Sequence, residues 1–132
     1  MEISGFLEQL ASDLVASGPA GWLLHFEESE RFYMGSDGSL VFPDYDSAAA
    51  YVGVLAETLD VIELDLLSPR VDVLSDSLAS VVSPYHESIT RHDGSAISFG
   101  GLVSMLIVRH SGTWKIRNLH WSSPVPTSPD ST

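Results

Sequence analysis

The chain has 132 residues, of which 44% are hydrophobic, so it has the size of one domain with one core and is too apolar to be disordered. It contains no cysteine, which excludes disulfides, thiolate nucleophiles, iron–sulfur clusters and cysteine-ligated zinc. Its 18 acidic and 6 basic residues give a formal charge of −12, which repels phosphate backbones and argues against nucleic acid as a partner.

No segment of the sequence has the character of a membrane span or a secretory signal. The longest apolar candidate, residues 102–108, is interrupted by Ser104 and is far shorter than the ~18 residues that a membrane helix needs. The first residues lack the basic start and apolar centre of a signal peptide. We therefore expect a cytoplasmic protein with no membrane partner.

Helical periodicity dominates the first part of the chain. Apolar residues recur every three or four positions over residues 3–15, which is typical of an amphipathic helix, and Gly18 and the proline after it end the pattern. A second, shorter helix is expected over 20–28 and a third over 46–59. The glycine-containing turn between them predicts a short hairpin within residues 31–42.

From residue 60 onward the apolar period changes from about 3.6 to two, which predicts strands. The expected strands cover residues 60–66, 71–73, 77–91, 96–110 and 113–121, with hairpin turns at 92–95 and 111–112. Helices followed by strands in a meander predict an α+β fold with one antiparallel sheet. Gly100 and Gly101 inside a long strand indicate strong bending, so we expect a cone-shaped sheet packed against the N-terminal helices.

The domain is expected to cover residues 1–122, and the proline- and serine-rich residues 123–132 are expected to form a disordered tail. In the strand over 96–110 both faces are apolar: Val103, Met105 and Ile107 alternate with Leu102, Leu106 and Val108. The outer face of a sheet in a domain of this kind normally contacts solvent, so an apolar outer face is expected to be buried against another surface. We expect a homodimer packed through this outer face; the alternative is that a helix or the tail folds over it.

The last expected strand pair carries a recognisable pattern. A turn containing Gly112 is followed by Trp114 and Ile116, then by His120 and Ser122. This order resembles the end of SnoaL-like proteins in the nuclear transport factor 2-like superfamily, and the order of helices and strands over residues 1–122 is also similar. The resemblance implies a cone with a pocket inside and dimers formed through the sheet. The superfamily includes ketosteroid isomerases, polyketide cyclases, dehydratases and epoxide hydrolases alongside interaction domains, so the fold alone does not choose a function.

The isomerase pattern of a tyrosine on the first helix with two pocket carboxylates is not recognisable, because that helix has neither Tyr nor His. Strand alternation places Asn118 and His120 on the inward face with Trp114 and Ile116, so both are expected on the pocket floor. His120 is a candidate catalytic residue because an imidazole exchanges protons near neutral pH. The alternative is that both side chains satisfy hydrogen bonds in the core.

Tyr85 and Glu87 share one face of the strand over 77–91, and His86 takes the other. We expect Tyr85 and Glu87 to face inward; with the opposite orientation His86 would face the pocket. A buried Glu beside a Tyr can form an acid/base pair, since desolvation raises a carboxyl pKa toward 7. The alternative for Glu87 is an exposed position or a surface pair with Arg91 or Arg117.

Aromatic residues are expected to complete the pocket, although aromatics at helical spacing also form ordinary core. Trp22 and His25 lie one turn apart on the second expected helix and so project to similar sides. The candidate catalytic residues are therefore His120, Glu87 and His25, and the candidate ligand-binding residues are Trp22, Tyr33, Tyr51, Tyr85, Phe99, Met105 and Asn118.

The five histidines show no spacing typical of a metal site, and no phosphate-binding loop or nucleophile elbow is present, so no metal or cofactor is expected. Three functions fit these observations. The first is a cofactor-free cyclase, isomerase or dehydratase that uses general acid–base catalysis on a small apolar molecule. The second is a non-catalytic binder of a hydrophobic metabolite, and the third is a dimerisation module.

Overall fold

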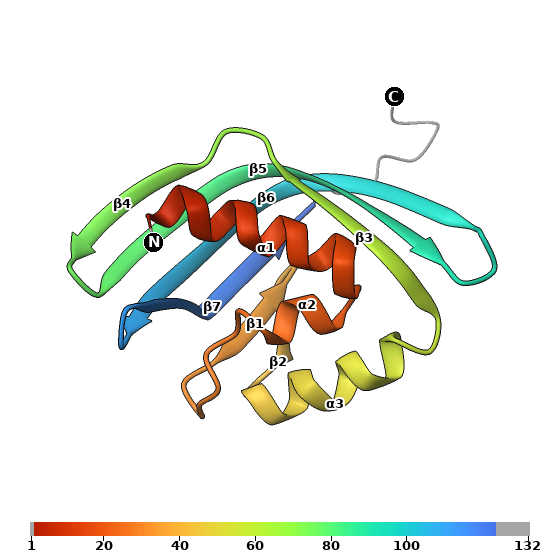
Figure 1. Cartoon of the computed structure of the whole chain (residues 1–132), viewed down its shortest axis with the longest axis horizontal. Coiled ribbons are helices and arrows are strands. Elements are labelled where there is room, and N and C mark those ends of the chain that lie inside the picture. The colour runs from red at the N-terminus through yellow and green to blue at the C-terminus, as the bar shows by residue number, and fades with distance from the viewer. Residues whose placement is uncertain (1, 124–132) are drawn as a thin grey trace.

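A computed structural model describes residues 2–123 as one strongly curved sheet whose concave face is covered by helices (Figure 1). The helices are α1 (Ile3–Ser17), α2 (Ala20–Leu23) and α3 (Tyr45–Leu55). The strands are β1 (Tyr33–Ser36), β2 (Ser39–Phe42), β3 (Leu59–Leu66), β4 (Arg70–Ser75), β5 (Leu78–Arg91), β6 (Ala96–His110) and β7 (Thr113–Ser122). The predicted α+β cone is confirmed.

The sheet has the strand order β2-β1-β7-β6-β5-β3, and β4 pairs with β5 beside β3. Hairpins connect β5 to β6 and β6 to β7, which makes these pairs antiparallel as expected. The pair of β1 and β7 is parallel, so the sheet is mixed rather than purely antiparallel. No hairpin joins these two strands, because the chain runs through β2, α3 and β3 to β6 between them.

The apolar stripe of α1 packs onto the sheet, as its spacing predicts. Leu10 and Leu14 are fully buried in the same core as Val81, Val103 and Ile107 from β5 and β6. Burying a side chain of this size contributes about 1.5–3 kcal/mol. The stripe thus fixes α1 across the concave face (Figure 1).

The second helix is much shorter than the predicted 20–28, because the backbone after it joins the sheet instead. The Ile116 N–H donates to the His25 carbonyl at 2.7 Å, and the Glu27 N–H donates to the Ile116 carbonyl at 2.8 Å. These bonds to the free edge of β7 replace the helical bonds that would continue α2. The third helix also ends early, at Leu55, and the predicted helical residue Leu59 begins β3.

The bend in the long strands brings two backbone segments into close contact. A Cβ atom placed on Gly101 would lie 1.9 Å from the Ser122 carbonyl oxygen at the end of β7. Only glycine permits this approach, which supports the expected role of the glycine pair in the curvature of the sheet. The curved β5–β6 hairpin extends past α1 at the end of the cone near β3 (Figure 1).

A β-bulge in β7 reverses the expected orientation of Asn118 and His120. Ile107 pairs with Ile116 and the next residue, Leu106, pairs with Asn118, so Arg117 is an extra residue in β7. Beyond the bulge the inward side chains are Leu119, which is 1% exposed, and Trp121. The prediction that Asn118 and His120 point into the cone is therefore wrong.

His120 lies on the outer face of the sheet, where it is exposed. Its ring carbon Cδ2 lies 2.9 Å from the position that a Cβ of Gly35 would occupy on the neighbouring strand β1. Of the predicted tail, Ser123 is ordered against Asp37, and residues 124–132 lie outside the described part of the chain. Within the described residues, no helix is long and apolar enough to cross a membrane.

Candidate ligand pocket

A cavity of about 280 Å³ lies inside the cone, between the helices, the β1–β2 hairpin and the concave face of the sheet. Its aromatic lining residues are Trp22, Phe26, Phe42, Tyr51, Tyr85, Phe99 and Trp121. Its aliphatic lining residues are Met34, Val41, Val52 and Leu55, and its polar ones are Ser36, Asp37, Glu87 and Ser123. A mostly apolar wall with a few polar groups is typical of a small-molecule site.

The aromatic side chains hold one another in defined orientations. The Trp121 ring contacts Tyr85 at a centroid distance of 4.8 Å and Trp22 at 5.5 Å, both nearly perpendicular. Trp22 also stacks on Phe26 at 5.7 Å, and Tyr85 meets Phe99 edge-on at 6.4 Å. Edge-to-face pairs of this kind add stability beyond simple burial, so this wall of the cavity is rigid.

Glu87 is the buried ionisable group of the cavity. The residue is 8% exposed, and its neighbours across the sheet are the uncharged Leu64 on β3 and Phe99 on β6. No described residue forms a hydrogen bond or ion pair with its carboxylate; Arg117, a partner that the sequence allowed, binds Glu27 instead. Burial raises the pKa of the Glu87 carboxyl to about 7, so this group gains and loses a proton near neutral pH.

Two further polar groups lie in the same cavity. Burial, followed by the charges of Glu87 and Asp37, raises the pKa of the Tyr85 hydroxyl, which therefore stays protonated and can donate a hydrogen bond. Asp37 sits in the β1–β2 turn with a positive φ of 48°. Its carboxylate accepts the Ser123 N–H at 2.9 Å and the Ser123 hydroxyl at 3.1 Å, which holds it beside the end of β7.

His25 does not line the cavity. Its Nε2 lies 2.7 Å from Asp13 Oδ2 on α1, and its ring packs edge-on against Phe6 at 5.4 Å. The hydrogen bond from His25 is the main cause that lowers the pKa of Asp13. Because α2 ends before His25, the helical spacing that placed this residue beside Trp22 does not apply, and the two side chains have different surroundings.

The structure thus brings together about half of the predicted site. Trp22, Tyr51, Tyr85, Glu87 and Phe99 line the cavity. The remaining candidates lie elsewhere: Tyr33 is half exposed on β1, Met105 is buried in the core, and His25, Asn118 and His120 point away.

Trp121 and Asp37 also line the cavity but were not among the residues predicted from the sequence. A signal for Trp121 was present, because the apolar alternation changes phase between Ile116 and Leu119, which is the mark of a bulge. Asp37 was assigned only to a turn, and its proximity to the pocket depends on how the β1–β2 hairpin meets β7.

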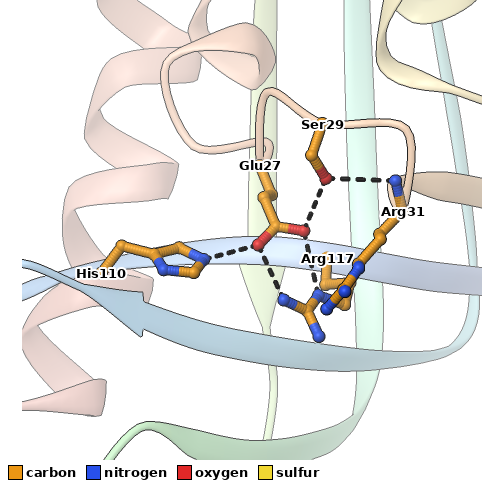
Figure 2. A network of polar contacts seen from close by, with 5 residues as sticks. All are labelled: Glu27, Ser29, Arg31, His110 and Arg117. Atoms are coloured by element: carbon orange, nitrogen blue, oxygen red, sulfur yellow. Dashed lines mark hydrogen bonds and ion pairs between the residues drawn. The ribbon is translucent and has the colours of Figure 1, made fainter.

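A second polar cluster, outside the cavity, surrounds Glu27 (Figure 2). Arg117 donates two bonds to the Glu27 carboxylate, at 2.9 and 3.0 Å, while His110 Nε2 lies 2.6 Å from it and Ser29 donates at 2.9 Å. These contacts, chiefly the one with Arg117, lower the pKa of Glu27 to about 2. A carboxylate with all of these partners is suited to fixing the loop after α2 to β7 rather than to moving protons.

A larger hollow of about 590 Å³ lies between α1 and the β3–β4 edge. Its ionisable residues, Glu8 and Asp65, are both exposed, so their carboxylates stay solvated. The described residues also contain no group of three His, Asp or Glu side chains that could hold a metal ion. The inner cavity with its buried carboxyl is therefore the stronger candidate site.

No protein-family model matches the sequence, and no curated protein matches it. Solved structures do match. A nuclear transport factor 2-like superfamily protein from Salmonella enterica serovar Typhimurium is 18% identical with a TM-score of 0.75, over 98% of this chain and 94% of that one. A proposed scytalone dehydratase from Novosphingobium aromaticivorans is 13% identical with a TM-score of 0.74, over 89% of this chain and 78% of that one.

A ketosteroid isomerase-like protein from Erwinia carotovora atroseptica is 14% identical with a TM-score of 0.68, over 94% of this chain and 95% of that one. At such identities the likeness shows the fold alone. The chain has the nuclear transport factor 2-like, ketosteroid isomerase-like fold, as the C-terminal pattern and the element order predicted. The narrower resemblance to SnoaL-like proteins stays a prediction.

Proposed function

We propose that the inner cavity binds a small, largely apolar molecule and that Glu87 transfers a proton to or from it, in a cofactor-free reaction of the isomerase or dehydratase type. The observation that carries this proposal is a carboxyl that is 8% exposed, has no partner among the described residues and lines an aromatic cavity. With a pKa of about 7, both its acid and its base forms are populated at neutral pH, which is optimal for general acid–base catalysis.

The surroundings of Glu87 supply the other needs of such a reaction. The hydroxyl of Tyr85 can donate a hydrogen bond to an oxygen that gains negative charge when Glu87 removes a proton from carbon. The aromatic wall offers flat apolar surfaces that match a flat ligand. Two of the solved structures with this fold are described as a proposed scytalone dehydratase and as ketosteroid isomerase-like, which supports this class of reaction.

Neither His25 nor His120 takes part in this proposal, since both lie away from the cavity. Glu87 would then act alone, accepting a proton at one position of the ligand and returning it at another. A single carboxyl can fulfil both roles because its protonated form is the acid of the second step.

The test is the ring-opening of 5-nitrobenzisoxazole, a flat neutral molecule that any well-placed base converts by removing one C–H proton while the N–O bond breaks. We expect turnover by the wild-type protein to rise with pH through about 7, as Glu87 ionises. Glu87→Gln should lower the rate about 100-fold. Glu63→Gln is the matched control, because Glu63 is exposed on the opposite face of the neighbouring strand β3.

Two results would count against catalysis. If the probe quenches the fluorescence of Trp22 and Trp121 but Glu87→Gln leaves the reaction rate unchanged, the cavity is a binding site without this chemistry. If the probe neither binds nor reacts, the cavity is not a small-molecule site. The first result would favour the non-catalytic binder among the functions considered from the sequence.

We also propose that the outer face of the sheet binds a second copy of the chain. Val82 and Leu102 are exposed there, and the outward residues of β5, β6 and β7 include no Asp or Glu although the chain carries a charge of −12. A carboxylate-free face on an acidic protein allows two copies to approach without direct repulsion.

A further inference from the structure

The ionisable side chains around the inner cavity other than tyrosine are all acidic. Asp37 and Glu87 line it, and no Lys, Arg or His is among the described lining residues. From this charge pattern and the aromatic wall we infer that the ligand is a flat aromatic molecule carrying a positive charge, such as a protonated or quaternary amine. This inference rests on the proposed function and adds the chemical class of the ligand.

The Lys and Arg side chains of β5 and β7, the strands that carry Glu87 and Trp121, are engaged elsewhere. Arg117 pairs with Glu27, Lys115 donates to the Leu24 carbonyl at 2.6 Å, and Arg91 lies 3.4 Å from the Ser95 hydroxyl. Among the described residues, no basic side chain pairs with Glu87 or lines the cavity. A buried carboxylate without a partner is costly, so a ligand that brings its own positive charge supplies the missing half of an ion pair.

The aromatic side chains favour the same ligand class. Trp22, Tyr85, Phe99 and Trp121 lie close together in the cavity wall, and the faces of such rings attract cations. Aromatic rings combined with carboxylates are a recurrent way to bind organic cations. An anionic ligand would instead place a third negative charge beside Asp37 and Glu87, in a cavity with no basic side chain from the described residues to offset it.

The charge of the cavity changes with pH, and the ligand preference should change with it. The other titratable groups that line the cavity with Glu87 are Tyr85 on its own strand, Tyr51 on α3 and Asp37 from the β1–β2 turn; the flanking Leu64 and Phe99 are uncharged. A cation binds more tightly when Glu87 is ionised, so its affinity should rise as the pH passes through about 7 and then level off. A neutral ligand of the same shape should show no such rise.

The experiment compares three ligands of nearly equal shape: benzyltrimethylammonium, neutral neopentylbenzene and anionic phenylmethanesulfonate. Their dissociation constants are measured by tryptophan fluorescence at constant ionic strength, at pH 5.5 and 8.5. At pH 8.5 we expect the cation to bind at least tenfold more tightly than the neutral molecule, and the anion to bind most weakly. At pH 5.5 the preference for the cation should shrink several-fold.

Variants assign the preference to the cavity rather than to the net charge of the chain. Glu87→Gln should remove the pH dependence of cation binding while leaving the neutral ligand unchanged, and Asp37→Asn combined with it should lower the remaining preference to the part that the aromatic rings contribute. Glu63→Gln, on the opposite face of β3, should change neither. Equal affinities for cation and neutral molecule at pH 8.5, or a preference for the cation that the double variant leaves undiminished, would overturn the inference.

The two proposals fail in distinguishable ways. Glu87-dependent ring-opening of 5-nitrobenzisoxazole without any preference for the cation would leave the proposed function standing and refute the ligand class. Failure of all the probes to bind would refute both.

Discussion

Glu87 shows how one residue can serve a site at the expense of stability. Its carboxyl has a pKa of about 7 in the folded protein against an ordinary 4.5, so the folded state holds this proton more tightly than the unfolded state. The free energy of unfolding therefore falls as pH rises from about 4.5 to about 7, and it stays at this lower value at higher pH.

We therefore predict that Glu87→Gln, which removes the charge but keeps the shape, stabilises the protein at pH 8.5 by up to about 3 kcal/mol and has little effect at pH 4. Urea unfolding at both pH values measures this. The exposed Glu63→Gln serves as control and should shift neither value by more than about 0.5 kcal/mol. If Glu87→Gln changes the free energy of unfolding by the same amount at pH 4 and at pH 8.5, Glu87 ionises in the folded protein without an energetic penalty.

Strand β7 shows how an irregularity in one element decides the composition of the site. The bulge residue Arg117 shifts the alternation, which turns Trp121 into the cavity and His120 out of it. The same residue supplies the guanidinium that binds Glu27, so the bulge also anchors the loop after α2 (Figure 2). The loop carries Phe26, which lines the cavity.

Breaking the ion pair between Glu27 and Arg117 should destabilise the folded protein. We predict that Glu27→Gln lowers the free energy of unfolding at pH 7 by about 3 kcal/mol. The substitution replaces the buried carboxylate by a neutral amide and leaves Arg117 without its ion-pair partner. Since the pKa of Glu27 is lowered to about 2 in the folded protein, the stabilisation is present above pH 4.5 and is lost as pH falls toward 2. Chemical denaturation of wild type and variant across this range measures the loss.

The adjacent Glu28 is exposed and provides the control for this change. Glu28→Gln should alter stability by less than about 0.5 kcal/mol at any of these pH values. If both substitutions have equal effects, the bonds around Glu27 contribute nothing beyond surface charge.

At the scale of the whole molecule, the open question is what covers the outer face of the sheet. We predict that the wild-type chain is a dimer in solution and that Leu102→Glu, which places a carboxylate in the middle of this face, converts it to a folded monomer. Light scattering after size-exclusion chromatography measures the mass, and circular dichroism checks the fold. Leu67→Glu is the matched control, because Leu67 is 62% exposed in the β3–β4 connection.

A wild-type chain that stays monomeric at high concentration would refute the dimer, as would a Leu102→Glu variant of unchanged mass. The apolar residues of the outer face would then be ordinary surface, which a folded protein of this size tolerates.

The long elements were predictable because their signals are local. The strand over 96–110 was predicted with the bounds that β6 has, and the apolar stripe of α1 packs as its spacing required. Within the site, the inward orientation of Tyr85 and Glu87 was preferred because Val81, Ser83 and Ile89 share their face, but the opposite face with Val82 is nearly as apolar, and only the structure decided between them. Side-chain periodicity depends only on neighbouring residues, and the sequence contains all of that information.

What only the tertiary structure decided depends on contacts between distant segments. The end of α2, the parallel pairing of β1 with β7 and the bulge at Arg117 arise from backbone groups that compete for partners far along the chain. The sequence identified Glu87 as a carboxyl that burial could activate, but its isolation depends on the register of the sheet, which places the uncharged Leu64 and Phe99 beside it. The sequence by itself thus predicted the cone and five of the residues that line its cavity. Packing determined that Glu87 lost most of its contact with water and has no partner among the described residues, because desolvation is a property of the assembled core.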